Sequence, residues 1–314
     1  MAEARFRVAQ AGPLVSVQDG GRPGLMRYGV PASGGMDRKA LALANLSLGR
    51  DPGAPAIEVS LGGLRLDCVA GRVSLAVTGG GFVVETGGRR AGSWGIFTLE
   101  AGQSITVRRG PWGAWAYVAF AGTLQAPRWL GSAATLTASG LGGGLLRAGQ
   151  EWTVSGCEAR AERILTCPVT CRARPVLHVV PGPQQRCFAP SARNALIDTP
   201  WVVTAQGDRM GVRLSGPPLA LADALSIPSE PILRGALQVA GDGVPVLLMA
   251  DHQTTGGYPK IATVLDDDLD GFAQLRPGEP LLFESIEPEE AGALARFRAG
   301  RWADYLGRVR DAAA

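Results

Sequence analysis

The chain has 314 residues, of which 46% are hydrophobic and 19% are charged. This composition is typical of a globular protein of about two domains and excludes an intrinsically disordered chain. The 31 basic and 28 acidic residues leave a net charge of +3, which is too balanced for a protein that binds nucleic acid through a basic surface. No apolar run approaches the roughly 18 residues of a membrane span, so we expect a cytoplasmic protein without a signal peptide or a membrane partner.

Most predicted elements are short strands, in keeping with 44 glycines and 22 prolines. In chain order, β-branched or apolar segments bounded by Gly or Pro predict strands at 72–78, 104–107, 115–120, 176–180 and 244–250. Apolar residues recur with helical spacing in 37–48 and again in 289–309. We expect the last segment to be a helix that packs on its own domain; the alternative is a helix that binds a partner protein.

The two halves of the chain share landmarks in the same order. Glu58 corresponds to Glu230, and the apolar strand after Gly71 corresponds to the one after Gly243. Two dipeptides also recur: Gly12-Pro13 as Gly182-Pro183, and Asp37-Arg38 as Asp208-Arg209. We therefore predict a mainly β fold of two tandem domains from an internal duplication, with residues 1–160 in the first, 161–288 in the second and 289–314 as a helical tail.

The cysteines and histidines do not form a recognisable metal-binding pattern. The five cysteines include no C-x-x-C pair, and only two histidines are present, His178 and His252. We expect free structural thiols and no bound metal. Lysine occurs only at positions 39 and 260, so chemistry that needs an amine has few candidate side chains.

In the first half, polar residues gather in two glycine-rich segments. Gln18, Asp19 and Arg22 lie in a loop whose glycines allow the backbone to approach a ligand. The alternative for this loop is an Asp19–Arg22 pair that stabilises a turn. Asp37 precedes the first predicted helix, where its carboxylate could cap the helix or bind a ligand.

The second half carries the densest polar segment, at 251–260, directly after an apolar strand. Its candidate ligand-binding side chains are Asp251, Gln253, Thr254, Thr255, Tyr258 and Lys260. Burying so many polar groups without a purpose would be costly, and Lys260 could pair with a phosphate or carboxylate. The chain has no P-loop, no G-x-S-x-G motif and no Ala-Met-Lys-Met biotin-attachment sequence.

Taken together, these motifs resemble the biotin-dependent carboxyltransferase-like family that includes the C subunit of 5-oxoprolinase, also labelled KipI antagonist or allophanate hydrolase subunit 2. The matching segments are VQDGGRPG (17–24), GVPASGGMD (29–37), AN (44–45), IE (57–58), LGS (130–132), DRMGVRLSG (208–216), SEPILRGALQV (229–239) and DHQTTGGYPKIATV (251–264). They extend over nearly the whole chain. The resemblance adds Glu58, Arg209, Glu230 and Gln238 to the candidate substrate-binding residues, and it identifies no catalytic residue.

The resemblance implies two cyclophilin-like β-barrels in one chain. It also implies an ATP-dependent 5-oxoprolinase complex that opens 5-oxo-L-proline to L-glutamate, with ATP and Mg²⁺ used by the complex. The implied partners are a protein like the 5-oxoprolinase B subunit, which would share substrate activation, and a hydrolase like the A subunit. We expect the chain to be inactive alone, because it has neither a nucleotide motif nor a nucleophile–base set.

The sequence departs from the family pattern at Gly20, Ala133-Ala134, Gln150 and His252. The change at 133–134 removes a guanidinium and a hydroxyl from one ligand loop, so a different amide substrate is an open possibility. Two other functions also remain open. One is the carboxyltransferase subunit of a urea or amide carboxylase, with biotin carried on another protein. The other is a non-catalytic regulatory antagonist of a kinase inhibitor.

Overall fold

The computed structural model describes residues 2–222 and 227–312. The chain divides into two compact units. The first unit contains Met1–Arg22, Ser33–Ala173 and Ala303–Ala314, and the second contains Pro23–Ala32 and Arg174–Trp302. These units are defined by spatial contact, whereas the ranges 1–160, 161–288 and 289–314 describe a sequence repeat and its tail. Those ranges stay a prediction.

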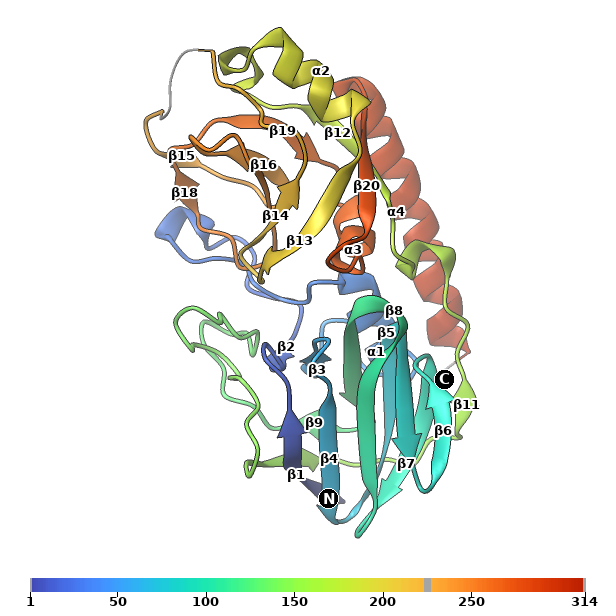
Figure 1. Cartoon of the computed structure of the whole chain (residues 1–314). Helices are drawn as coiled ribbons and strands as arrows, with labels where there is room; N and C mark the ends of the chain where they lie inside the picture. Colours follow the sequence, from blue (N-terminus) through green and yellow to red (C-terminus); the bar gives the residue numbers. More distant parts are fainter. Residues whose placement is uncertain (1, 223–226, 313–314) are drawn as a thin grey trace. The chain divides into compact units, whose positions relative to one another are not determined.

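In the described part of the first unit, eleven strands form one sheet, whose main path runs β11-β7-β5-β8-β4-β1-β10-β9 (Figure 1). The strands are β1 (Glu3–Ala11), β2 (Ser16–Gln18), β3 (Ala56–Val59), β4 (Leu64–Ala70), β5 (Arg72–Thr86), β6 (Arg89–Gly92), β7 (Gly95–Glu100), β8 (Ser104–Phe120), β9 (Thr123–Leu124), β10 (Glu151–Ser155) and β11 (Arg163–Ile164). The helical segments that precede the C-terminal helix in this unit are α1 (Arg38–Leu46) and the 3₁₀ turn η2 (Val169–Cys171).

The core of this unit follows from strand alternation. In β1, Ala4, Phe6 and Val8 are buried while the residues between them are exposed, as the two-residue period of a strand requires. Phe6 packs against Phe120 of β8, with ring centroids 5.3 Å apart. The apolar side chains of one sheet face therefore form the core of the first unit.

The second unit contains a closed barrel in the order β12-β19-β16-β17-β14-β13-β20. The barrel strands are β12 (Val176–Pro181), β13 (Trp201–Gly207), β14 (Gly211–Ser215), β16 (Ala236–Val239), β17 (Pro245–Leu248), β19 (Lys260–Val264) and β20 (Pro280–Ser285). A two-stranded sheet joins β15 (Glu230–Pro231) and β18 (Thr255–Gly256). The unit also contains η1 (Met26–Tyr28), η3 (Gln185–Cys187), α2 (Pro190–Asp198) and α3 (Asp268–Ala273).

The C-terminal helix, α4, spans Pro288–Asp311 (Figure 1). Its first turns pack on the second unit, because Ala291 and Leu294 belong to an apolar cluster with Leu265 and Ile286. Arg298 adds an ion pair to the buried Asp268 at 2.8 Å. Within the described residues, none of the helices combines the length and the apolar character needed to cross a bilayer.

The prediction of a mainly β chain with a C-terminal helix is confirmed. Two details differ from the sequence-based expectations. The strands expected at 104–107 and 115–120 are parts of the single strand β8, because the chain passes Gly110 and Gly113 with irregular pairing to β5 instead of breaking. Asp37 precedes α1, whereas its proposed counterpart Asp208 lies in the turn between β13 and β14 and accepts a hydrogen bond from the Met210 N–H at 2.7 Å. All five cysteines are free.

Candidate functional site

The glycine-rich loop of the first unit is bound to the segment 129–134. The Asp19 carboxylate is buried and accepts hydrogen bonds from the Ser132 hydroxyl at 2.6 Å and the Ala133 N–H at 2.6 Å. Arg22 donates to the carbonyl of Ala134, and its guanidinium lies 5.0 Å from the Trp129 ring. Since backbone groups of residues 133 and 134 make these contacts, the change to alanine there is compatible with them.

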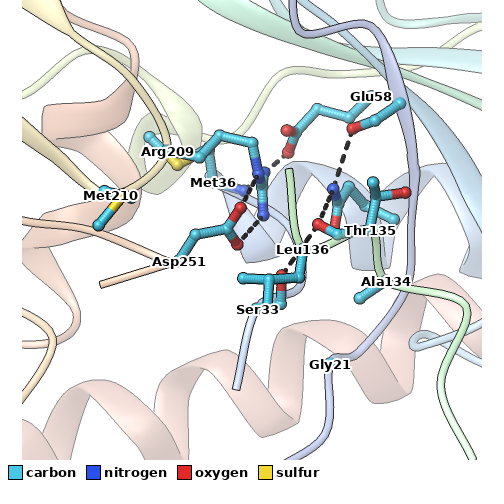
Figure 2. Close-up of polar contacts among 12 residues, drawn as sticks. Gly21, Ser33, Met36, Glu58, Ala134, Thr135, Leu136, Arg209, Met210 and Asp251 are labelled. Carbon is cyan, nitrogen blue, oxygen red and sulfur yellow. Dashed lines mark hydrogen bonds and ion pairs between the residues drawn. The ribbon is translucent and has the colours of Figure 1, made fainter. Parts of the chain in front are cut away.

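Gln18 is completely buried at the end of β2. Its amide Nε2 donates to the Ser16 hydroxyl at 2.9 Å and to the Thr135 carbonyl at 3.1 Å. The same carbonyl accepts from the Ser33 hydroxyl at 3.1 Å (Figure 2). Within the described residues, the Gln18 Oε1 has no hydrogen-bond donor. Sequence reasoning overlooked Thr135, which offered no signal beyond its place after the LGS motif.

Asp37 and Glu58 stabilise the start of α1. Asp37 caps the helix by accepting from the Ala40 N–H at 2.9 Å. The Glu58 Oε2 accepts from the Met36 N–H at 2.8 Å and from the Tyr117 hydroxyl at 2.7 Å. Burial and the Glu58 carboxylate raise the pKa of Tyr117 well above its usual 10.0, so the phenol keeps its proton. These contacts give both carboxylates a structural role.

Tyr117 was not among the candidates, because it lies in the apolar run of β8 and resembles a core residue. A buried tyrosine hydroxyl nevertheless needs a partner. That requirement is the signal that could have directed attention to it. Its hydroxyl also accepts from the Asp37 N–H at 2.8 Å, and this bond joins β8 to the cap of α1.

In the second unit, Arg209 and Asp251 form a buried ion pair (Figure 2). Two parallel hydrogen bonds join them, from Nη2 to Oδ1 at 2.9 Å and from Nε to Oδ2 at 3.1 Å. The Asp251 N–H also donates to the Arg209 carbonyl at 2.8 Å. This two-point geometry holds the start of the 251–260 loop against the turn before β14.

Lys260 is paired with Glu230. The lysine side chain is 4% exposed, and its Nζ lies 2.6 Å from the Glu230 Oε1; the glutamate side chain is 38% exposed. Gln184 bridges them, since its Nε2 donates to Glu230 at 2.8 Å and its Oε1 accepts from the Lys260 N–H at 3.3 Å. The hydrogen bonds from Lys260 and Gln184 hold the pKa of Glu230 below its usual 4.5. Sequence reasoning overlooked Gln184, although it follows the repeat landmark Gly182-Pro183.

Gln238 lies opposite Lys260 in the β16–β19 pairing. Its Oε1 accepts from the Gln253 Nε2 at 3.2 Å. Its own Nε2 is buried and, among the described residues, has no hydrogen-bond acceptor. Gly256 packs closely here, because a Cβ would lie 2.4 Å from the Ile232 Cδ1 and 3.0 Å from the Gln238 Nε2, and these side chains would have to shift to accommodate it.

The remaining loop candidates are more open. Thr254 is partly buried, Thr255 is exposed in β18 and Tyr258 is 48% exposed. In the part of the chain that the structure describes, the two threonine hydroxyls form no hydrogen bond. His252 is buried, its Nδ1 lies 2.7 Å from the Gln253 carbonyl, and burial lowers its pKa below 6.5. The histidine is therefore neutral near pH 7.

The structure thus gathers Glu230, Gln238, Gln253 and Lys260 with Gln184 into one group, which we refer to as the amide cluster. Because Lys260 is already paired with Glu230, the cluster offers amides and lysine N–H groups more than free positive charge. Such a set suits a neutral amide ligand better than a polyphosphate. The described residues contain no group of three His, Cys, Asp or Glu side chains that could hold a metal ion.

Comparisons with known proteins agree with this architecture. The family model described as carboxyltransferase domain, subdomain A and B, matches residues 28–285. The chain is 33% identical to the C subunit of 5-oxoprolinase from Escherichia coli (strain K12), over 91% of this chain and 93% of that protein. It is 34% identical to the C subunit of 5-oxoprolinase from Haemophilus influenzae, over 94% of this chain and 96% of that protein.

A solved structure, the urea amidolyase of K. lactis, superimposes with a TM-score of 0.86 at 25% identity, over 98% of this chain. The chain spans only 20% of that longer protein. The family match covers most of the sequence, and both bacterial relatives align along nearly their full length. The chain therefore belongs to the carboxyltransferase domain family, subdomains A and B.

Proposed function

We propose that this chain is the C subunit of an ATP-dependent 5-oxoprolinase, and that its amide cluster binds the lactam group of 5-oxo-L-proline. Two bacterial relatives, aligned along nearly their full length, carry the name of the 5-oxoprolinase C subunit. The observation that carries the proposal is the buried Gln238 Nε2, a donor without a described acceptor, next to the paired Lys260. A buried donor of this kind is costly unless a ligand satisfies it.

A lactam carbonyl would complete this group. Its oxygen would accept from the Gln238 Nε2, and Lys260 keeps further N–H groups after pairing with Glu230. Negative charge grows on the carbonyl oxygen when the lactam is activated, and a fixed ammonium in a dry site stabilises such charge more than water does. Glu230 and Gln184 would act by positioning the Lys260 Nζ.

ATP with Mg²⁺ is proposed for the assembled complex, where it supplies the energy for opening the lactam. We do not assign it to the amide cluster, because the Lys260 charge is already balanced there. The proposed partners are a protein like the 5-oxoprolinase B subunit and a hydrolase like the A subunit, consistent with relatives that are named as one subunit of an enzyme. The chain alone is expected to have no 5-oxoproline turnover.

The test is 5-oxoproline-dependent ATP hydrolysis by the reconstituted complex, with and without this chain. We expect turnover only when this chain and both partners are present. Turnover by the single chain, or full turnover by the partners alone, would contradict the proposal. A parallel assay with urea, bicarbonate and a biotin-carrier protein tests the carboxyltransferase alternative, which the K. lactis urea amidolyase structure supports. Activity only in that assay would replace the proposal.

The role of Gln238 is tested by the Gln238→Leu variant in the same complex. Losing one hydrogen bond to the substrate should raise KM for 5-oxoproline about tenfold, equivalent to about 1.4 kcal/mol. The change should be larger in KM than in kcat if Gln238 mainly binds the ground state. An unchanged KM in a folded complex would show that the Gln238 amide does not bind 5-oxoproline.

A further inference from the structure

The first unit contains a cavity of about 930 Å³ that none of the candidate residues lines. Its walls come from β5, β6 and β8 and from the segment around η2. The residues that carry the argument are Arg90, Trp94, Trp112, Cys167 and Arg172. The volume is within the range of about 300–1,000 Å³ that is usual for small-molecule sites. We refer to this space as the tryptophan cavity.

The tryptophan cavity is lined by residues from the part of the β5–β8 pairing that is irregular. The register shifts on both sides of Gly81, which is paired with Trp112. A Cβ on Gly81 would lie 2.3 Å from the Trp112 Nε1, so the indole rests directly on the glycine backbone. Irregular pairing of this kind is frequent beside binding sites, because it re-aims side chains. Here the half-buried Trp112 is the side chain that it brings to the cavity wall.

Trp94 is held in an unusual conformation at the same cavity. Its φ of 70° is in the left-handed region, which is rare for a bulky residue. Three hydrogen bonds hold it there: its N–H donates to Val77 at 2.6 Å, its Nε1–H donates to Gly79 at 2.5 Å, and its carbonyl accepts from the Leu165 N–H at 2.8 Å. Backbone strain that the surroundings enforce in this way is concentrated at ligand sites.

The charge of the tryptophan cavity is positive. Arg90 and Arg172 both line it and are exposed, and no carboxylate is among its lining residues. Within residues 2–222 and 227–312, neither guanidinium forms an ion pair. Burial raises the pKa of the Cys167 thiol, which is therefore neutral. Two guanidinium groups beside the Trp112 indole favour a ligand that has both an anionic group and a planar ring.

We propose that the tryptophan cavity binds an organic anion with a planar aromatic ring, of about the size of a nucleoside monophosphate. The ring would pack against the half-buried Trp112, and the anionic group would be bound by Arg90 and Arg172. The inference is independent of the proposed function, because it concerns binding to the chain alone and not turnover by the complex.

The test is calorimetric titration of the full chain with AMP, together with tryptophan fluorescence. We expect saturable binding by AMP and a change in the emission of the indoles. Adenosine, which has the ring without the charge, and inorganic phosphate, which has the charge without the ring, should each bind at least about tenfold more weakly. Raising the salt concentration should weaken AMP binding, because both guanidinium groups are exposed.

The variant Arg90→Gln/Arg172→Gln tests the site directly. Both side chains are exposed, so the fold should tolerate the change, and AMP affinity should fall about tenfold or more. The matched control is Arg7→Gln/Arg147→Gln, which removes the same charge from exposed positions of the first unit outside the cavity. The proposal is overturned if AMP does not bind at millimolar concentration, or if both double variants bind it as the parent chain does. Failure here would leave 5-oxoproline turnover by the complex unaffected, so the two proposals can fail separately.

Discussion

Glu58 and Glu230 occupy matching places in the predicted repeat but lie in opposite environments. Glu58 is completely buried in β3 and accepts hydrogen bonds from Met36 and Tyr117, which together position α1. Glu230 is 38% exposed and pairs with Lys260, a buried amine in the amide cluster. The Glu58 carboxylate stabilises the fold. The Glu230 carboxylate belongs to the amide cluster, in which the Gln238 Nε2 has no acceptor among the described residues.

The difference lies in what surrounds each carboxylate. Two hydrogen-bond donors to Glu58, the Met36 N–H and the Tyr117 hydroxyl, belong to the backbone and to a core tyrosine, so they are fixed by the fold. The donors to Glu230 are the long side chains of Gln184 and Lys260, which lie on separate segments. These side chains could also bind a ligand. Stability should therefore depend more on Glu58, and activity more on the cluster around Glu230.

The largest expected effect on stability is that of Glu58→Ala. It leaves a buried N–H and a buried hydroxyl without their acceptor and should lower the free energy of unfolding by about 3 kcal/mol. Glu230→Ala should cost about 1 kcal/mol, because water can fill the space that the 38% exposed carboxylate leaves and replace its hydrogen bonds to Lys260 and Gln184. Urea denaturation of the two variants measures the contrast. Equal losses of unfolding free energy would contradict the distinction between a structural Glu58 and a ligand-binding Glu230.

A smaller effect is expected at the second pair of matching positions. Asp37→Ala removes the N-cap of α1 and should lower the free energy of unfolding by about 1 kcal/mol. Asp208→Ala removes a turn contact at an exposed position and should cost less, within about 0.5 kcal/mol. The same denaturation assay applies. A larger loss at Asp208 than at Asp37 would mean that the turn, and not the helix cap, is the critical element.

The smallest effect concerns pH and His252. Burial lowers the pKa of this histidine below 6.5, so the unfolded chain binds the proton more readily than the folded chain. Its contribution to stability is therefore complete above pH 6.5 and is lost as pH falls through the lower pKa of the folded state. His252→Gln should remove this dependence, and urea denaturation across that range measures it. Identical pH profiles for the two proteins would refute the assignment of a neutral buried imidazole.

Local features were predictable from the sequence, and long-range partners were not. The N-cap role of Asp37 could be anticipated because it depends only on the residues that follow it. The irregular course of β8 could not, since it depends on how Gly110 and Gly113 pair with β5. Tyr117 and Gln184 were overlooked because their roles come from partners far along the chain, Glu58 and Glu230. Residue type can indicate that a buried tyrosine hydroxyl needs a partner, but residue type and spacing do not identify a partner so far along the chain.

The most direct test of the amide cluster is the 5-oxoproline-dependent turnover of the assembled complex with Lys260→Ala, per folded molecule. Losing a charge-assisted hydrogen bond in a dry site should lower kcat/KM by about tenfold to more than a hundredfold, or roughly 1.5–3 kcal/mol. Lys39→Ala is the control, because Lys39 is the other lysine and is buried in α1 of the first unit. We expect Lys39→Ala to lower thermal stability while keeping turnover per folded molecule. Full activity of Lys260→Ala, with unchanged affinity for 5-oxoproline and ATP, would contradict the account and make the cluster part of the scaffold.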